Sequence, residues 1–255
     1  MGIANPLGVA KAAAVLEAEL KHFGLTVDVS SDMHAFNEAK KQARGFEVAP
    51  MHHYEVGVFD NERAQWLALK DGDGKIVGLQ AFRCDQVDTN LADWGVTYMV
   101  GAYMRRRELM VPSHAKPARG SVSERLSGKL AYHGELWIEK CHRNRDVIEH
   151  FVRLALILTY IKWQPDAIWA LAGAHIVERG HLSRSGYNTL ELGFMRWQLA
   201  SDGIDPFEYL YVVEKHSIET MIEIWAAKEA LYPRERVHKQ PSHATHRLQV
   251  KNPAQ

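Results

Sequence analysis

The chain has 255 residues and 46% of them are hydrophobic, so it can bury a sizeable core as one domain or as two small ones. Its 31 basic and 31 acidic side chains give a formal net charge of zero, which argues against general binding to nucleic acid and leaves only a local basic patch. The two cysteines, Cys84 and Cys141, lie far apart in the sequence and do not form a disulfide framework, so we expect reduced thiols.

The start of the chain lacks the basic segment and continuous apolar core of a signal peptide. No apolar run is long enough to cross a membrane without carrying charges. We therefore expect a soluble, cytoplasmic protein with no membrane partner and no nucleic-acid partner. Residues 233–255 are basic and almost free of apolar side chains, so we expect a mobile tail after a single domain of residues 1–232.

The N-terminal third predicts two helices followed by a hairpin. Residues 9–22 are rich in Ala and Leu and end before Gly24, and residues 32–44 form a polar helix capped by Ser30 or Ser31. The alternating runs "AQWLALK" and "KIVGLQAFRC" are joined by "DGDG", whose residues can adopt positive φ. This pattern predicts a β-hairpin.

Two further segments precede the centre of the chain. Residues 89–109 predict a helical insert, although two glycines interrupt it. Residues 112–128 are rich in Ser, Gly, Pro, Lys and Arg, which predicts a long loop of the kind that serves as a lid, a binding loop or a mobile segment.

From Gly134 onward the pattern changes to strand, helix, strand. "ELWIEKC" predicts a strand, residues 147–163 a helix that is apolar almost all round, and "AIWALA" a second strand. Such a helix is expected to cross over between two neighbouring strands. A short helix over residues 175–184, two more strands and a last helix over residues 218–231 follow. The fold class is therefore α/β with a mixed sheet, a strand-helix-strand core and flanking helices.

A basic corner, Arg143-Asn144-Arg145, separates the strand from the helix in "LWIEKCHRNRDVIEHF". The start of a helix offers free N–H groups and a favourable dipole, so this corner could bind phosphate. It could equally be a plain polar turn.

The order of these elements resembles the GNAT (Gcn5-related) N-acyltransferase fold over residues 66–187. "WLALKDGDGKIVGLQAF" resembles the second and third strands of that family, and "LWIEKCHRNRDVIEHF" resembles its fourth strand and pyrophosphate loop. "AIWALAGAHIVERGHLSRSGYN" resembles the fifth strand and the helix after it. In that family the fourth and fifth strands splay apart around the pantetheine arm of an acyl-coenzyme A, and loop N–H groups hold the pyrophosphate.

The resemblance implies a set of residues that bind the acyl-coenzyme A co-substrate: Ile138, Lys140, Arg143, Asn144, Arg145, Asp146 and Val147. The loop is a degenerate form of the family pattern, because no glycine occurs between Cys141 and Ile148. Either arginine side chains replace the backbone contacts of those glycines, or coenzyme A does not bind.

Acyl transfer to an amine needs a base and a hydrogen-bond donor. Glu135 and Glu139 alternate along the strand and are expected to share one face, so either could take the proton, with Glu135 preferred; the alternative is two solvent-facing carboxylates. The tyrosine acid of the family falls on Leu182, which leaves His181 and Tyr187 as candidate acids. The alternative for both is a structural role.

Fourteen histidines raise the question of a metal site, but none has the spacing of a helical pair or of a zinc finger, so we predict no metal. The run Arg105-Arg106-Arg107 is expected to complement a helix end. With Lys116 and Arg119 it could instead line an entrance for an acidic substrate or an adenosine phosphate.

Together these patterns favour an N-acyltransferase that moves an acyl group from acyl-coenzyme A to a small-molecule amine by direct attack. An acyl carrier protein could replace coenzyme A as the donor, and the chain could form a homo-oligomer. The competing hypothesis is a non-catalytic, GNAT-derived module that binds a ligand or regulates a partner.

Overall fold

A computed structural model describes residues 3, 5–45, 47–57, 60–99, 101–102, 111–114, 119–200 and 205–231 of the chain. The arginine run 105–107, Lys116 and the predicted basic tail lie outside the described residues. Within them, no helix has both the length and the apolar character that a membrane crossing requires.

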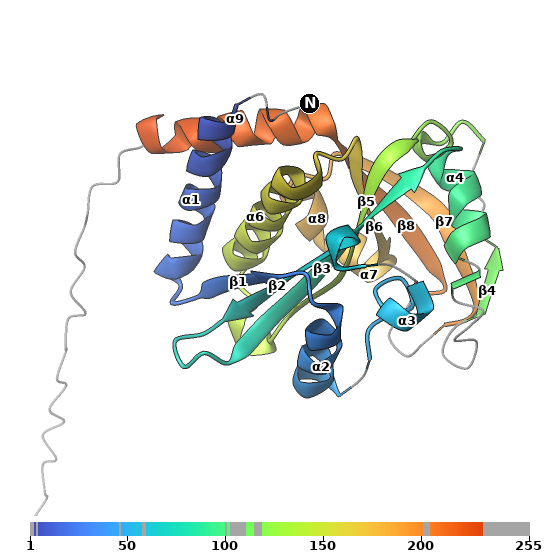
Figure 1. Cartoon of the computed structure of the whole chain (residues 1–255), viewed down its shortest axis with the longest axis horizontal. Coiled ribbons are helices and arrows are strands. Elements are labelled where there is room, and N and C mark those ends of the chain that lie inside the picture. Colours follow the sequence, from blue (N-terminus) through green and yellow to red (C-terminus); the bar gives the residue numbers. More distant parts are fainter. Residues whose placement is uncertain are drawn as a thin grey trace, which may run out of the picture.

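The core is one mixed β-sheet. Its strands in the described part of the chain are β1 Thr26–Ser30, β2 Ala64–Lys70, β3 Ile76–Val87, β4 Val111–His114, β5 Gly128–Ile138, β6 Ala167–Gly173, β7 Thr189–Leu199 and β8 Phe207–Glu214. They lie in the order β1-β2-β3-β5-β6-β8-β7-β4 (Figure 1). Every neighbouring pair is antiparallel except β5 and β6, which run parallel. The predicted mixed sheet with a strand-helix-strand core is confirmed.

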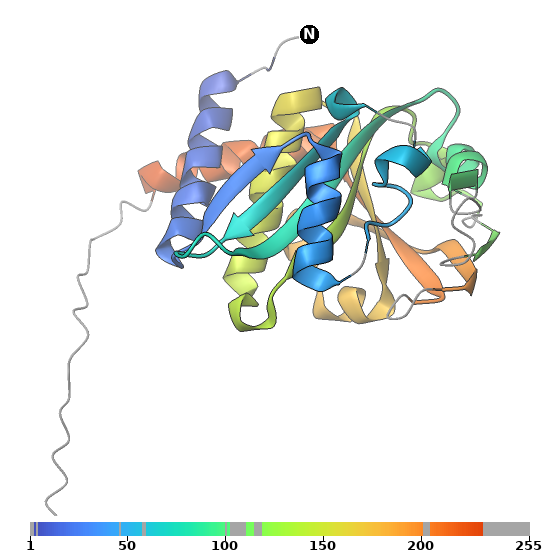
Figure 2. The same ribbon diagram turned by 60° about the horizontal axis from the view of Figure 1, so that its bottom comes forward.

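Helices cover both faces of this sheet. Their bounds are α1 Pro6–His22, α2 Met33–Arg44, α3 Tyr54–Gly57, α4 Leu91–Trp94, α6 Arg145–Trp163, α7 Ala174–Arg179, α8 His181–Arg184 and α9 Lys215–Leu231. Helices α1, α6 and α9 pack together on one face, while α2 and α4 lie on the other (Figures 1 and 2). The two faces therefore have separate apolar cores.

The crossover helix α6 is the central element of the first face. Its side chains contact α1, α9 and the sheet, and Phe151, Leu156 and Ile157 are fully buried. This explains why the segment is apolar almost all round, as a parallel strand pair with a helical crossover requires. Asn144 caps the helix, because its side chain accepts a hydrogen bond from the N–H of Asp146 at 2.9 Å.

Several elements differ from the sequence prediction. The strand β1 was not predicted, because it is only five residues long and half exposed. Helix α2 is capped by Asp32 rather than by Ser30 or Ser31, since Asp32 accepts hydrogen bonds from the N–H groups of His34 and Ala35. The helical insert contains α4 and a π-helical turn at Gly95–Met99, and β4 lies where a loop was expected.

The packing of α6 can be tested with two aliphatic residues of that helix. Leu156→Ala leaves a cavity in the core and should lower the free energy of unfolding by about 2–5 kcal/mol. Ile161, which is 39% exposed, is the control, and Ile161→Ala should cost less than about 1.5 kcal/mol. Urea denaturation measures both, and equal costs would show that α6 is not packed as described.

Candidate active site

The candidate site begins where β5 and β6 part. The two strands pair from Leu130 opposite Ala167 to His133 opposite Ala170, and no further. Beyond that point β5 continues along β3 and β6 continues along β8, with Gly173 opposite Glu208. We call this opening the fork. Its two arms are residues 134–138 of β5 and residues 171–173 of β6, and the edges that face each other are unpaired.

A β-bulge starts the β5 arm. Glu135 and Leu136 together oppose the single residue Gln80 of β3, and Glu135 has a φ of 61°. Bulges bend a strand and increase its twist, so this one turns β5 away from β6. The preceding Gly134 is required by close approach, because a Cβ atom there would lie 2.7 Å from the ring of His52.

Glu135 is held on the α2 side of the sheet. Its carboxylate forms an ion pair with Lys40 of α2 and accepts a hydrogen bond from the N–H of Ala49 at 2.5 Å. Both charged side chains are only 6% exposed. Burial lowers the pKa of Lys40, and the adjacent carboxylate of Glu135 opposes that shift. Glu135 thus lies at the fork, with both of its oxygens engaged.

Glu139 lies beyond the end of the strand, in a different setting. Both of its carboxylate oxygens contact the Nζ of Lys75, at 2.8 and 2.9 Å, and its side chain is 32% exposed. The bulge at Glu135 interrupts the regular alternation that the prediction assumed for these two glutamates. Glu139 belongs to the basic corner rather than to the fork.

The basic corner lies at the start of α6. Arg143 donates from Nε to the backbone oxygen of Ile138 at 2.7 Å, which ties the corner to the end of β5. The carboxylate of Glu149 accepts from Arg145, Arg153 and Arg184 at distances of 2.7 to 3.2 Å. Burial opposes the ionisation of Glu149, but these arginines hold its pKa below the ordinary value. Three guanidinium groups around one carboxylate leave a positive surplus at the helix start.

The remaining residues of the predicted binding set occupy the same corner. Lys140 lies in a single 3-10 turn, and Val147 is buried in the first turn of α6. Asp146 in that turn complements the helix dipole with a negative charge. Together with Ile138, Arg143, Asn144 and Arg145, these residues follow one another along the chain around one helix terminus.

The candidate acids lie on the α6 face of the sheet. Tyr187 is buried, and its hydroxyl group is 2.8 Å from Nδ1 of His133, the last residue of β5 that pairs with β6. Burial raises the pKa of Tyr187 well above its ordinary value and lowers that of His133 to about 3. His181 lies 3.0 Å from a guanidinium nitrogen of Arg184, and burial and that charge lower its pKa.

A carboxylate that sequence reasoning missed lies beside the other arm of the fork. Glu208 of β8 is partly buried, lies opposite Gly173, and accepts a hydrogen bond from Nε1 of Trp197 at 2.7 Å. Burial raises its pKa to about 7, the Trp197 hydrogen bond opposes the rise, and Asp205 adds to it. A carboxylate that titrates near neutrality can act as a general base.

Tyr132 connects the two carboxylates electrostatically. It lies at the closed end of the fork, stacked on His52 with ring centroids 5.1 Å apart. Burial raises its pKa well above the ordinary value, and the charges of Glu208 and Glu135 raise it further. The alternation of "FEYLYVVE" on β8 could have indicated that Glu208 shares a face with the apolar residues Leu210 and Val212.

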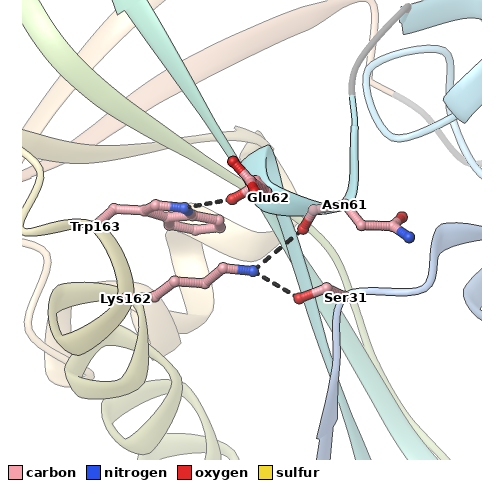
Figure 3. Close-up of a pocket in the computed structure, with 5 residues that line it drawn as sticks. All are labelled: Ser31, Asn61, Glu62, Lys162 and Trp163. Atoms are coloured by element: carbon pink, nitrogen blue, oxygen red, sulfur yellow. Dashed lines mark hydrogen bonds between the residues drawn. The ribbon is translucent and has the colours of Figure 1, made fainter.

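A shallow pocket of about 510 Å³ lies at the opposite, C-terminal end of α6 (Figure 3). There Lys162 donates to Ser31 at 2.6 Å and to the backbone oxygens of Asn61 and Ala64, and Trp163 donates to the backbone of Glu62 at 2.8 Å. Nineteen residues of helix place it about 28 Å from the basic corner. Because its lysine is engaged by the protein itself, this pocket fastens α6 to the β2 edge.

The chain was compared with known proteins. No protein-family model and no curated protein sequence matches it. Among solved structures, NAA60 of Arabidopsis thaliana in complex with acetyl-CoA has a TM-score of 0.44 at 12% identity, over 74% of this chain and 98% of that one. A putative phosphinothricin N-acetyltransferase has a TM-score of 0.40 at 14% identity, over 74% and 98%. The spermidine/spermine N-acetyltransferase SpeG of Vibrio cholerae has a TM-score of 0.44 at 10% identity, over 78% and 98%.

The fold is GNAT-like. The strand order, the parallel pair joined by a buried crossover helix, and the fork between those two strands identify it independently of the overlaps.

The buried pair at the fork yields a stability prediction. Lys40→Met leaves Glu135 buried without its cation and should lower the free energy of unfolding by about 3–5 kcal/mol. The double variant Lys40→Met with Glu135→Gln removes the uncompensated charge and should recover part of that loss. Lys41 on the same helix is the control, because its partners are exposed and Lys41→Met should cost about 1 kcal/mol or less. Equal effects at both lysines would contradict the buried pair.

Proposed function

We propose that the chain is an N-acyltransferase that moves an acyl group from the thioester of acyl-coenzyme A to an amine. The fork between β5 and β6 is the observation that carries this proposal. Its unpaired edges present backbone N–H and C=O groups to each other across the opening. An extended arm that contains amides can pair with such edges, as a peptide does when it adds a strand to a sheet. The pantetheine arm of coenzyme A has this chemistry.

The basic corner supports the same proposal at the other end of the ligand. The N–H groups at the start of α6 and the exposed guanidinium of Arg145 provide donors for a pyrophosphate. Arg184, which is partly exposed, adds positive charge next to them. Side-chain donors of this kind take over the task that glycine-lined backbone performs in the family pattern.

For the chemical step, we assign the general base to Glu208. Its pKa of about 7 suits the uptake of a proton from an ammonium group, whereas both oxygens of Glu135 are engaged by Lys40 and Ala49. The amine nitrogen bonds to the thioester carbonyl carbon, the C–S bond breaks, and the thiolate of coenzyme A leaves. The candidates for returning a proton to that thiolate are His181, beside Arg184, and Tyr187, at the closed end of the fork.

Binding of coenzyme A is tested by thermal unfolding with free, acetyl- and long-chain coenzyme A. At a concentration one hundred times the dissociation constant, the ligand should stabilise the protein by about 2.7 kcal/mol. Arg145→Ala removes a charged donor and should weaken binding by about tenfold to a hundredfold. Arg125→Ala, at an exposed arginine outside the corner, should leave binding unchanged. The absence of a shift with all three ligands would contradict coenzyme A as the donor.

The base is tested by the pH dependence of turnover with an amine acceptor. Glu208 must be ionised to take a proton, so kcat/KM should rise with pH and level off above about 7. Glu208→Gln should lower kcat/KM by about 10²–10⁴-fold and abolish this inflection. Glu135→Gln should keep the inflection. If it is lost in Glu135→Gln and kept in Glu208→Gln, Glu135 is the base. Coenzyme A binding without turnover in the wild type would favour the non-catalytic alternative.

A further inference from the structure

The turn that precedes α6 brings three metal-ligating side chains together. A carboxylate oxygen of Glu139, the Sγ atom of Cys141 and a ring nitrogen of His142 all lie within 4.8 Å of one another. The prediction of no metal considered the spacing of helical histidine pairs and of zinc fingers. It does not cover ligands at i, i+2 and i+3 in a tight turn.

The backbone explains this convergence. Lys140–His142 form a 3-10 turn that is closed by a hydrogen bond from the N–H of His142 to the oxygen of Glu139 at 2.9 Å. In a 3-10 turn the side chains at i and i+3 eclipse, which places those of Glu139 and His142 on the same side. The Nε of Arg143 reaches back to the oxygen of Ile138 at 2.7 Å and holds the turn from the other end. The backbone of the cluster is therefore set by the protein.

We propose that Glu139, Cys141 and His142 form a binding site for a divalent cation of the zinc class. A thiolate and an imidazole are ligands that Zn²⁺ prefers and that Mg²⁺ and Ca²⁺ do not. The thiolate and the carboxylate together balance the charge of the ion. Because Cys141 is exposed, water or a ligand atom can take the fourth tetrahedral position.

Lys75 is the competing cation at this site. Its Nζ contacts both oxygens of Glu139, at 2.8 and 2.9 Å, and its side chain is 61% exposed. A metal that binds one of these oxygens must displace the ammonium group or confine it to the other oxygen. Removal of this competitor should therefore tighten metal binding, which a purely structural role of the turn does not predict.

The test is titration of the chelator-treated full chain with Co²⁺ and then with Zn²⁺, followed by absorption spectroscopy and calorimetry. One equivalent of Co²⁺ should bind and give a thiolate-to-cobalt charge-transfer band, which Zn²⁺ then displaces. Cys141→Ser should abolish the band, and His142→Ala should weaken binding by at least about tenfold. Lys75→Met should strengthen it.

Two controls separate this site from other donors. Cys84, the only other cysteine, is buried, and burial raises the pKa of its thiol to about 12, so the band should persist in Cys84→Ala. His22→Ala, at an exposed histidine of α1, should leave the affinity unchanged. The proposal is overturned if Cys141→Ser keeps the band, if His142→Ala binds as tightly as the wild type, or if no saturable binding occurs.

Discussion

The ion pair between Glu135 and Lys40 lies at the point on which the rest of the structure depends. A residue other than glycine at positive φ is costly in a strand, and here the cost is offset by a buried cation and a backbone N–H from outside the sheet. The bulge that results turns β5 away from β6. The same contacts bring Ala49 and His52 over the bulge, where Gly134 leaves room for the histidine ring. The fork and the cover on its α2 side thus share one origin.

Local patterns in the sequence carried much of the fold. The hairpin was predictable because its strands alternate and its turn residues accept positive φ, and α6 because its apolar face spans most of the helix. The strand β1 was not, since five half-exposed residues give a weak signal. The bulge was also invisible, because a single extra residue leaves no mark in an alternating pattern that already contains Gly134 and Glu135.

The candidate site was predictable only in part, for a related reason. The corner residues are contiguous in sequence, so a helix start after a strand was enough to bring them together. Lys40, by contrast, is 95 residues from Glu135, and Arg184 is 35 residues from Glu149. The pKa of Glu208 depends on its burial beside Trp197 and Asp205, which no spacing rule encodes. Contacts between distant segments decide which charged groups are available for chemistry.

The position of α1 has a consequence for how the chain folds as it is made. This helix is synthesised first, yet Leu16 and Leu20 belong to the same buried cluster as Ile218 and Ile222 of α9, the last helix in the described part of the chain. Helix α6 lies beside both. Contacts between such distant segments form slowly, and a domain that needs its C-terminal helix cannot complete its core during translation. The apolar face of α1 must therefore wait, exposed or shielded by a chaperone, until the ribosome has released α9.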